Sequence, residues 1–352
     1  MLIPPSGSRA PGCAIGLDIG GTKIAAGLVA FPEGRVLARR IIPTDAQRPG
    51  AEVLADALSL ARDQLAEAAR LAMAPVGLGV GVAELVDPEG RITSDQTIAW
   101  RNLPVREAFA ALAPTLIDAD VRMAARAEAR FGAGQGVDPW IYVTVGTGIS
   151  YCLVQGGHPY TGTHGNALIF ASAPLSTTCP VCGSMLQPVL EEIASGSALA
   201  VRYNQVAAVP ARSGHEVVAA AAAGDPKAVW VVRSGGAALG CGVAFLINTL
   251  DPAAVVVGGG LGLAGGLYWE AFIDAARAHI WAEATRDVPI HSALLGVDAG
   301  LVGAATTAWD SHTPDGSGEN GTSAPSKESL PRSRMKGTRP AAKPTPDDRG
   351  TI

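Results

Sequence analysis

Aromatic residues are scarce in this sequence, at 5% of 352 residues, although hydrophobic residues make up 48%. A sizeable core is therefore expected, but Ala, Val, Leu and Gly must fill most of it. No apolar stretch reaches transmembrane length without interruption, so we expect no membrane span. The first dozen residues lack a charged start followed by an apolar run, and we expect no secretory signal peptide.

Cysteine and excess positive charge are also lacking. Five cysteines in a chain of this length do not form a disulfide framework, and we expect a reduced, cytoplasmic protein. The net charge of −5 provides no broad basic field, so we expect no nucleic-acid partner. The length suits two domains that share a cleft, or one large domain.

The composition changes along the chain. Residues 1–12 are expected to be flexible. Residues 311–352 are rich in Ser, Pro, Gly, Thr and charge, and so poor in large apolar residues that we expect a disordered tail. Between these ends, strands alternate with helices, which predicts α/β sheets covered by helices. We place the domain boundary near residue 120, giving one α/β domain at 13–120 and a second at 121–310.

A strand, a glycine turn and a second strand occur together once in each half of the chain. Glycines allow a backbone to approach an anionic group closely and with positive φ. The N–H groups and the threonine hydroxyl of such a turn can bind phosphate oxygens, and an aspartate at the strand end can hold Mg²⁺ through water. Either turn alone could be an ordinary hairpin, but one from each half could clamp a triphosphate. The residues concerned are Asp18, Gly20, Gly21, Thr22 and Lys23 in the first turn, and Gly146, Thr147 and Gly148 in the second.

Three bare glycines, Gly258, Gly259 and Gly260, follow the apolar run AVVV. Glycines at a strand end form a flat surface on which an adenine or a ribose could lie. A loose strand-to-helix turn explains them equally well without further context.

Asp120 ends the predicted strand TLIDAD and precedes a predicted helix. A carboxylate at this position can accept the proton of an attacking hydroxyl in phosphoryl transfer. It can also cap the helix that follows. Asp118 is a rival, but strand alternation directs it to the opposite face.

Taken in order, these motifs resemble the ROK family (repressors, open reading frames and sugar kinases) of the actin-like, hexokinase-like ATPases. DIGGTK and VGTGI match its two phosphate loops, VVVGGGLG its adenosine segment, DADVRMAARAE its catalytic segment and LVGAATTA its closing helix. Counting back from Glu128 aligns Asp120, and not Asp118, with the family's catalytic aspartate. The resemblance covers roughly residues 13–309. It implies two actin-like, ribonuclease H-like domains with an interdomain cleft, ATP with Mg²⁺, and a homodimer or homotetramer.

The sugar-binding motifs match the family less well. The family has an asparagine before the catalytic aspartate, and this chain has Ala119 there. The family loop Gly-Val-Pro-Gly corresponds to Gly-Val-Ala-Glu here, and its last residue, Glu84, could supply a replacement contact. The family's Gly-Glu-Ile-Gly-His falls, without gaps, on residues 168–172, which lack both polar groups. A shifted register would put Asn166 near the glutamate position. Glu191 matches a family glutamate that contacts sugar hydroxyls, although an exposed helix residue is the alternative.

The family's zinc motif is incomplete. Cys179 and Cys182 are present, but the third cysteine is missing, and two thiolates do not make a four-ligand zinc site. His158 or His164 would be needed to complete one. Zinc is therefore not expected, and the two cysteines remain at most a degenerate half-site.

The resemblance implies an ATP-dependent, glucokinase-like kinase that phosphorylates a hydroxyl, expected to be the hydroxymethyl, of a hexose or hexose-like molecule. Because a site that lacks particular hydrogen-bonding partners changes its preference, an amino sugar or a C7-cyclitol of a biosynthetic pathway is an alternative acceptor. A non-catalytic sugar or nucleotide sensor is a further alternative, which the retained Asp120 and phosphate loops disfavour. A repressor of the same family would carry a DNA-binding domain before Asp18, and since only 17 residues precede Asp18 we do not expect a repressor.

Overall fold

The computed structural model describes residues 10–174 and 176–312. The expected flexible segment at 1–12 and the expected tail at 311–352 therefore lie largely outside the described residues. Residues 311 and 312 form the end of a helix, and the first strand begins at Gly12.

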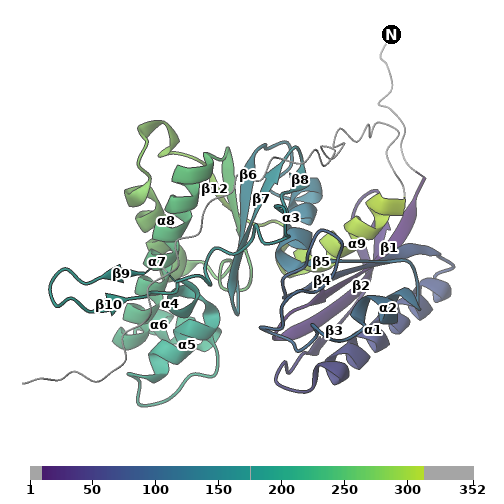
Figure 1. Cartoon of the computed structure of the whole chain (residues 1–352), viewed down its shortest axis with the longest axis horizontal. Coiled ribbons are helices and arrows are strands. Elements are labelled where there is room, and N and C mark those ends of the chain that lie inside the picture. Colours follow the sequence, from purple (N-terminus) through teal and green to yellow (C-terminus); the bar gives the residue numbers. More distant parts are fainter. Residues whose placement is uncertain (1–9, 175, 313–352) are drawn as a thin grey trace, which may run out of the picture. The chain divides into compact units, whose positions relative to one another are not determined.

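The first sheet has five strands in the order β3-β2-β1-β4-β5 (Figure 1). β1, β2 and β3 pair antiparallel as successive hairpins, whereas β4 and β5 run parallel to β1. Both faces of the central strands are buried, which explains why their sequences read as continuous apolar runs. The strands are β1 (Gly12–Ile19), β2 (Lys23–Phe31), β3 (Arg35–Pro43), β4 (Pro75–Val82) and β5 (Thr115–Ala119).

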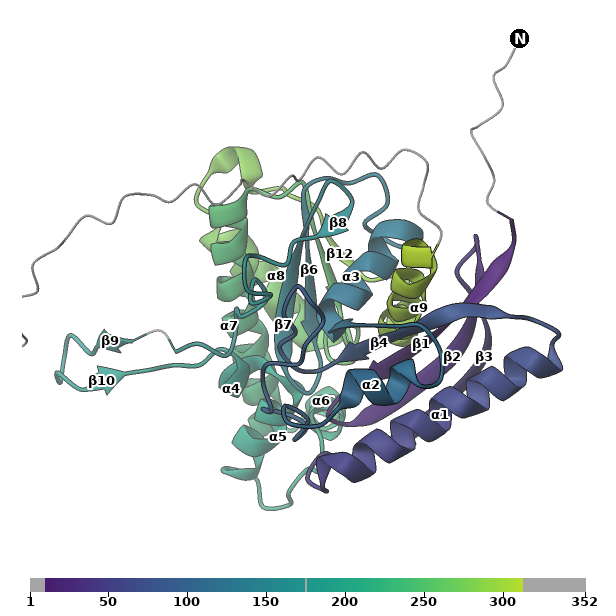
Figure 2. The same cartoon turned by 45° about the vertical axis from the view of Figure 1, so that its right-hand side comes forward.

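Helices cover the two faces of this sheet. The amphipathic helix α1 (Gly50–Arg70) packs its apolar stripe on one face, and the short α2 (Val105–Ala110) adds to the same core. The other face is covered by α9 (Ala299–His312), the last described helix, which lies almost against the backbone of the sheet (Figure 2). A Cβ added at Gly16 would lie 2.0 Å from the Leu301 carbonyl oxygen, so only glycine permits this approach.

The second sheet also has five strands, in the order β12-β11-β6-β7-β8. Helix α3 (Asp120–Phe131) covers one face, and a group of helices around α7 covers the other. The strands are β6 (Trp140–Val145), β7 (Ile149–Gln155), β8 (His158–Pro159), β11 (Ala254–Gly258) and β12 (Ile290–Ser292). The helices around α7 are α4 (Glu191–Ala194), α5 (Gly196–Asn204), α6 (Gly214–Ala222), α7 (Pro226–Leu250) and α8 (Gly266–His279). A two-stranded hairpin, β9 (Thr177–Thr178) and β10 (Met185–Leu186), projects from this part in both views (Figures 1 and 2).

The predicted α/β class is confirmed, with one five-stranded sheet in each half. The boundary near residue 120 falls where β5 meets α3, and it stays a prediction. Helix α9, which follows the second sheet in sequence, packs on the first sheet and on α3. The chain therefore crosses back to its first part at its end.

Helix α7 is long and apolar enough to cross a membrane by length and composition, and it is the one such helix among the described residues. Over half of its most apolar window, 56%, is buried inside the protein. Its buried face packs against α8 and the second sheet, as the core helix of a globular protein does.

Candidate active site

The first glycine turn joins β1 to β2 and is braced from outside the hairpin. The Gly20 N–H donates to the Lys23 carbonyl at 3.0 Å, which closes the turn. Thr44, which is fully buried just after β3, donates its hydroxyl to the Gly20 carbonyl at 2.6 Å. The Thr44 N–H donates to the Thr22 carbonyl at 3.0 Å. The motif alone gave no signal for Thr44, because its contact depends on how β3 ends.

The second glycine turn joins β6 to β7 and is held by the start of α5. The Gly146 N–H donates to the Gly148 carbonyl at 2.9 Å, and the Gly196 N–H donates to the Gly146 carbonyl at 2.7 Å. The Ser197 hydroxyl donates to the Thr147 carbonyl. Helix α5 thus begins directly beside this turn, where its N-terminal partial positive charge favours an anion.

The two turns meet although they lie far apart in sequence. The hydroxyl oxygens of Thr22 and Thr147 are 2.8 Å apart and share a hydrogen bond. The structure therefore brings together the two predicted phosphate-binding turns. Both hydroxyls and the adjoining backbone groups lie at one junction.

The predicted adenosine segment lies next to the second turn. The N–H groups of Leu261 and Gly262 donate to the Val145 carbonyl at 2.9 and 3.0 Å. Gly259 has φ of +81°, and a Cβ there would lie 2.4 Å from the same carbonyl oxygen, so a side chain is excluded. A Cβ at Gly260 would lie 3.3 Å from the His215 imidazole, which identifies His215 as a neighbour that the sequence did not indicate.

Asp18 and Asp120 lie close enough for their charges to interact. Burial raises the pKa of Asp18 to about 6, which the nearby Lys23 opposes. Burial, together with the charge of Asp18, raises the pKa of Asp120 to about 7, although the Val121 N–H and the Arg122 guanidinium lower it. Neither carboxylate forms an ion pair within the described ranges. Neither carboxylate is thus held by a cation in the way that Asp118 is, although Asp120 accepts the Val121 N–H at 2.6 Å.

The rival Asp118 is held in a salt bridge with Arg122. Its Oδ1 accepts a hydrogen bond from the Arg122 Nε at 2.6 Å and another from the Ala119 N–H at 2.8 Å. Arg122 is 1% exposed, so this ion pair is largely out of water. The geometry thus leaves Asp120, and not Asp118, available to accept a proton.

Glu84 is buried and fully engaged with its own loop. Its carboxylate accepts hydrogen bonds from the Ser94 hydroxyl and from the N–H groups of Gln96, Thr97 and Ile98, the last two at 2.7 Å. These four donors account for both carboxylate oxygens. The contacts favour an anchor for the loop at 94–98 over the direct substrate contact that the sequence suggested.

The other two predicted substrate residues differ from each other. Asn166 is exposed, in the loop that follows β8, beside Gly165. Glu191 is half-buried at the start of α4, and its Oε2 accepts the Ile149 N–H at 2.7 Å. Glu191 thus also braces the second glycine turn, through the first residue of β7.

Cys179 and Cys182 lie on the β9–β10 hairpin, away from both glycine turns. The Cys182 thiol donates to the Ser184 hydroxyl at 3.2 Å, and hydrogen bonds to Ser184 and Cys179 lower its pKa to about 7. Within the part of the chain that the structure describes, no group of three or more His, Cys, Asp or Glu side chains could hold a metal ion. The donor set therefore does not fit zinc, and its absence stays a prediction.

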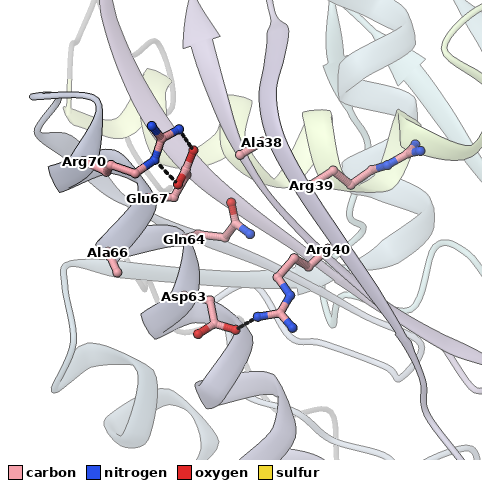
Figure 3. Close-up of a pocket in the computed structure, with 8 residues that line it drawn as sticks. All are labelled: Ala38, Arg39, Arg40, Asp63, Gln64, Ala66, Glu67 and Arg70. Carbon is pink, nitrogen blue, oxygen red and sulfur yellow. Dashed lines mark hydrogen bonds and ion pairs between the residues drawn. The ribbon is translucent and has the colours of Figure 1, made fainter.

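A separate hollow of about 450 Å³ lies between β3 and α1 (Figure 3). Four of its charged side chains pair with one another: Arg40 bonds Asp63, and Arg70 bonds Glu67 at 2.6 and 2.8 Å. Arg39 pairs with Asp298, outside the hollow. None of the predicted site residues lines it. It is therefore not part of the candidate site.

Comparisons with known proteins agree with this architecture. A model of the ROK family matches residues 14–311. A glucokinase from Streptomyces coelicolor is 33% identical over 318 residues, covering 84% of this chain and 98% of that protein. An N-acetylmannosamine kinase from Escherichia coli is 31% identical over 299 residues, covering 84% and 97%. Among solved structures, a Streptomyces griseus glucokinase in complex with glucose and AMPPNP has a TM-score of 0.73 at 33% identity, covering 85% of this chain and all, 100%, of that one. These likenesses confirm the expected fold.

Proposed function

Because the chain belongs to the ROK family, we propose that it is an ATP-dependent kinase that phosphorylates a hydroxyl of a hexose or hexose-like molecule. Its relatives include glucokinases and N-acetylmannosamine kinases, which are sugar kinases. The observation that carries the proposal is the hydrogen bond between Thr22 and Thr147, which joins the two turns assigned to phosphate.

The nucleotide side of the site consists of residues 20–22, 146–148 and 258–260. We assign the phosphates of ATP to the two turns, whose N–H groups and threonine hydroxyls can donate to phosphate oxygens. We place the adenosine on the glycines after β11, which lie next to the second turn through the Val145 carbonyl. The Streptomyces griseus glucokinase, which was solved with AMPPNP, supports an adenine nucleotide as the ligand. Backbone donors held by Thr44, Glu191 and α5 are preorganised for charge on the transferring phosphoryl group.

The acceptor side consists of Asp120 and the loops that carry Glu84 and Asn166. The hydroxyl oxygen of the acceptor attacks the γ-phosphorus in line, and the bond between this phosphorus and the ADP oxygen breaks. Asp120 accepts the proton that the hydroxyl loses. A pKa near 7 suits this task, because about half of the carboxylate is then ionised at pH 7 and the ionised form is basic enough to take a proton.

Mg²⁺ fits the carboxylate pair better than zinc fits the cysteines. Asp18 is half-buried and has no salt bridge in the described residues, its pKa is raised, and carboxylate oxygens are the ligands that Mg²⁺ prefers. Asp18 would hold the ion, directly or through water, and the ion would neutralise charge on the phosphates. Lys23, whose charge already favours ionised Asp18, adds to the positive potential there.

The acceptor remains the finer part of the proposal. A hexose hydroxymethyl, as in a glucokinase, is our first choice, with an amino sugar or a C7-cyclitol as the alternative, because the polar residues of the sugar loops differ from the family pattern. A non-catalytic sensor is the remaining alternative. We also propose that the protein acts in the cytoplasm as a homodimer or homotetramer.

A coupled ADP-release assay tests this proposal. The protein is given ATP and Mg²⁺ with glucose, mannose, fructose, amino and N-acetylated hexoses, and C7-cyclitols. We expect strong turnover with one acceptor, and a loss of kcat of about a hundredfold or more in Asp120→Asn with nucleotide binding retained. Binding of AMPPNP without turnover on any acceptor would favour the sensor.

A further inference from the structure

Arg122 is a buried cation with three partners from three separate parts of the chain. Its Nε bonds Asp118 at 2.6 Å, its Nη1 donates to the Gly165 carbonyl at 2.7 Å, and its Nη2 donates to the Val86 carbonyl at 2.8 Å. At 1% exposure, the guanidinium has essentially no contact with water. Its donors are satisfied by protein groups alone, which is the arrangement that a buried charge requires.

Each partner is close in sequence to a residue of the acceptor side. Asp118 and Arg122 flank Asp120, two residues away on either side, at the β5–α3 junction. Val86 is two residues beyond Glu84, and Gly165 is next to Asn166. The two loops also touch, since a Cβ at Gly165 would lie 2.1 Å from the Val86 carbonyl oxygen.

The nucleotide side has its own supports and does not depend on Arg122. Thr44 braces the first turn, and Glu191 and the start of α5 brace the second. Arg122 has no hydrogen bond to either turn among those described. Its removal is thus expected to loosen one side of the site and spare the other.

We propose that Arg122 is a positioning residue that fixes the two acceptor loops to the helix that carries Asp120, and thereby sets acceptor affinity. This inference rests on the proposed kinase function for its kinetic consequence. A planar guanidinium satisfies one carboxylate and two carbonyls in fixed directions, which a lysine ammonium does not reproduce. The residue therefore acts through the loops and does not need to touch the acceptor.

Steady-state kinetics of Arg122→Gln and Arg122→Lys test the proposal, with the acceptor identified by the wild-type panel. In Arg122→Gln the acceptor KM should rise about tenfold or more, while the KM for ATP stays within about twofold. The acceptor KM of Arg122→Lys should lie between those of the wild type and Arg122→Gln, since lysine keeps the charge opposite Asp118 but not both hydrogen bonds to the carbonyls. The matched control is Arg130→Gln, at the other end of α3, where Arg130 pairs with Asp310. It should leave both KM values near wild type.

The double variant Arg122→Gln with Asp118→Asn separates loop bridging from charge pairing. Our proposal expects the acceptor KM to stay raised, because the two carbonyl bonds are still lost. A return to the wild-type acceptor KM, or equal increases in both KM values in Arg122→Gln, would overturn it.

Hydrogen–deuterium exchange provides a readout that needs no activity and applies even if Arg122→Gln is poorly folded. In Arg122→Lys, exchange should rise in residues 84–94 and 161–168 and stay unchanged in residues 19–23 and 145–149. Unchanged exchange in both loops would contradict the proposal. If the wild-type protein phosphorylates no acceptor, the kinase function fails, whereas the exchange pattern still decides whether Arg122 holds the loops.

Discussion

On the nucleotide side, the groups assigned to phosphate are mainly backbone N–H donors in glycine turns, supported by a few neighbouring side chains. On the acceptor side, the loops are held by buried charged side chains, Glu84 and Arg122, each with several partners. Backbone donors depend little on side-chain identity, provided that glycine is kept. A side-chain network changes with each substitution, so the acceptor side can diverge while the nucleotide side keeps its sequence.

The largest expected difference between the two sides comes from Glu84. Glu84→Ala leaves four donors without their acceptor, and should lower the free energy of unfolding by about 3 kcal/mol. Denaturant unfolding monitored by fluorescence measures this. Glu89→Ala, on an exposed side chain of the same loop, is the control and should change it by less than about 0.5 kcal/mol. A mild effect at Glu84 would mean that the loop does not depend on its anchor.

The next largest expected difference between the acceptor side and the nucleotide side is in their pH dependence. Because the pKa of Asp120 is raised to about 7, the carboxylate becomes protonated as the pH falls through 7. The kcat/KM for the acceptor should then drop about tenfold per pH unit below that value. AMPPNP binding should weaken only near and below pH 6, where Asp18, the proposed Mg²⁺ ligand, becomes protonated. Asp18, Glu84, Arg122 and Tyr142 are the charged or titratable groups that act on Asp120 or feel its charge. A rate that is flat from pH 5.5 to 8 would remove Asp120 from the role of base.

Kinetics of Glu191→Gln show whether Glu191 serves the nucleotide side or the acceptor side. If it braces the second turn through Ile149, Glu191→Gln weakens a charge-assisted hydrogen bond and should raise the KM for ATP up to about tenfold. If it contacts the sugar, as the sequence suggested, the acceptor KM rises in its place. Glu192→Gln, the exposed neighbour, serves as the control and should alter neither value.

The smallest expected effect is at the contact between the two turns. Thr22→Val removes one hydroxyl from the hydrogen bond with Thr147 and should raise the KM for ATP about fivefold. Thr147→Val should do the same. The double variant should cost less than the sum of the two in free energy, since both singles remove the same bond. Strict additivity would show that the hydroxyls act independently.

The sequence predicted the glycine turns well, because a glycine turn at a strand end is a local pattern. Their meeting at Thr22 and Thr147 was expected from the clamp argument and is seen as a hydrogen bond. The site roles of these residues stay predictions. Asp120 was separated from Asp118 by alignment to a motif, and the salt bridge with Arg122 adds an independent physical reason.

Side-chain partners on the acceptor side could not be predicted in the same way. Glu84 was interpreted as a new substrate contact, because nothing in the sequence shows that residues 94–98 fold back over it. The role of Arg122 has no signal in the sequence, since a buried arginine on a helix is indistinguishable in sequence from an exposed one. Such contacts depend on loops that meet only after both sheets have formed.

Helix α9 is the last described element of the chain, yet it covers one face of the first sheet, whose strand β1 is the first element of the chain. During synthesis, the part of the molecule made first must wait for the part made last. Until residues 299–312 leave the ribosome, apolar side chains such as Ala14 and Val29 lack the cover that α9 provides on that face. The first sheet is therefore synthesised before the second, but its packing is completed only when the last helix has been made.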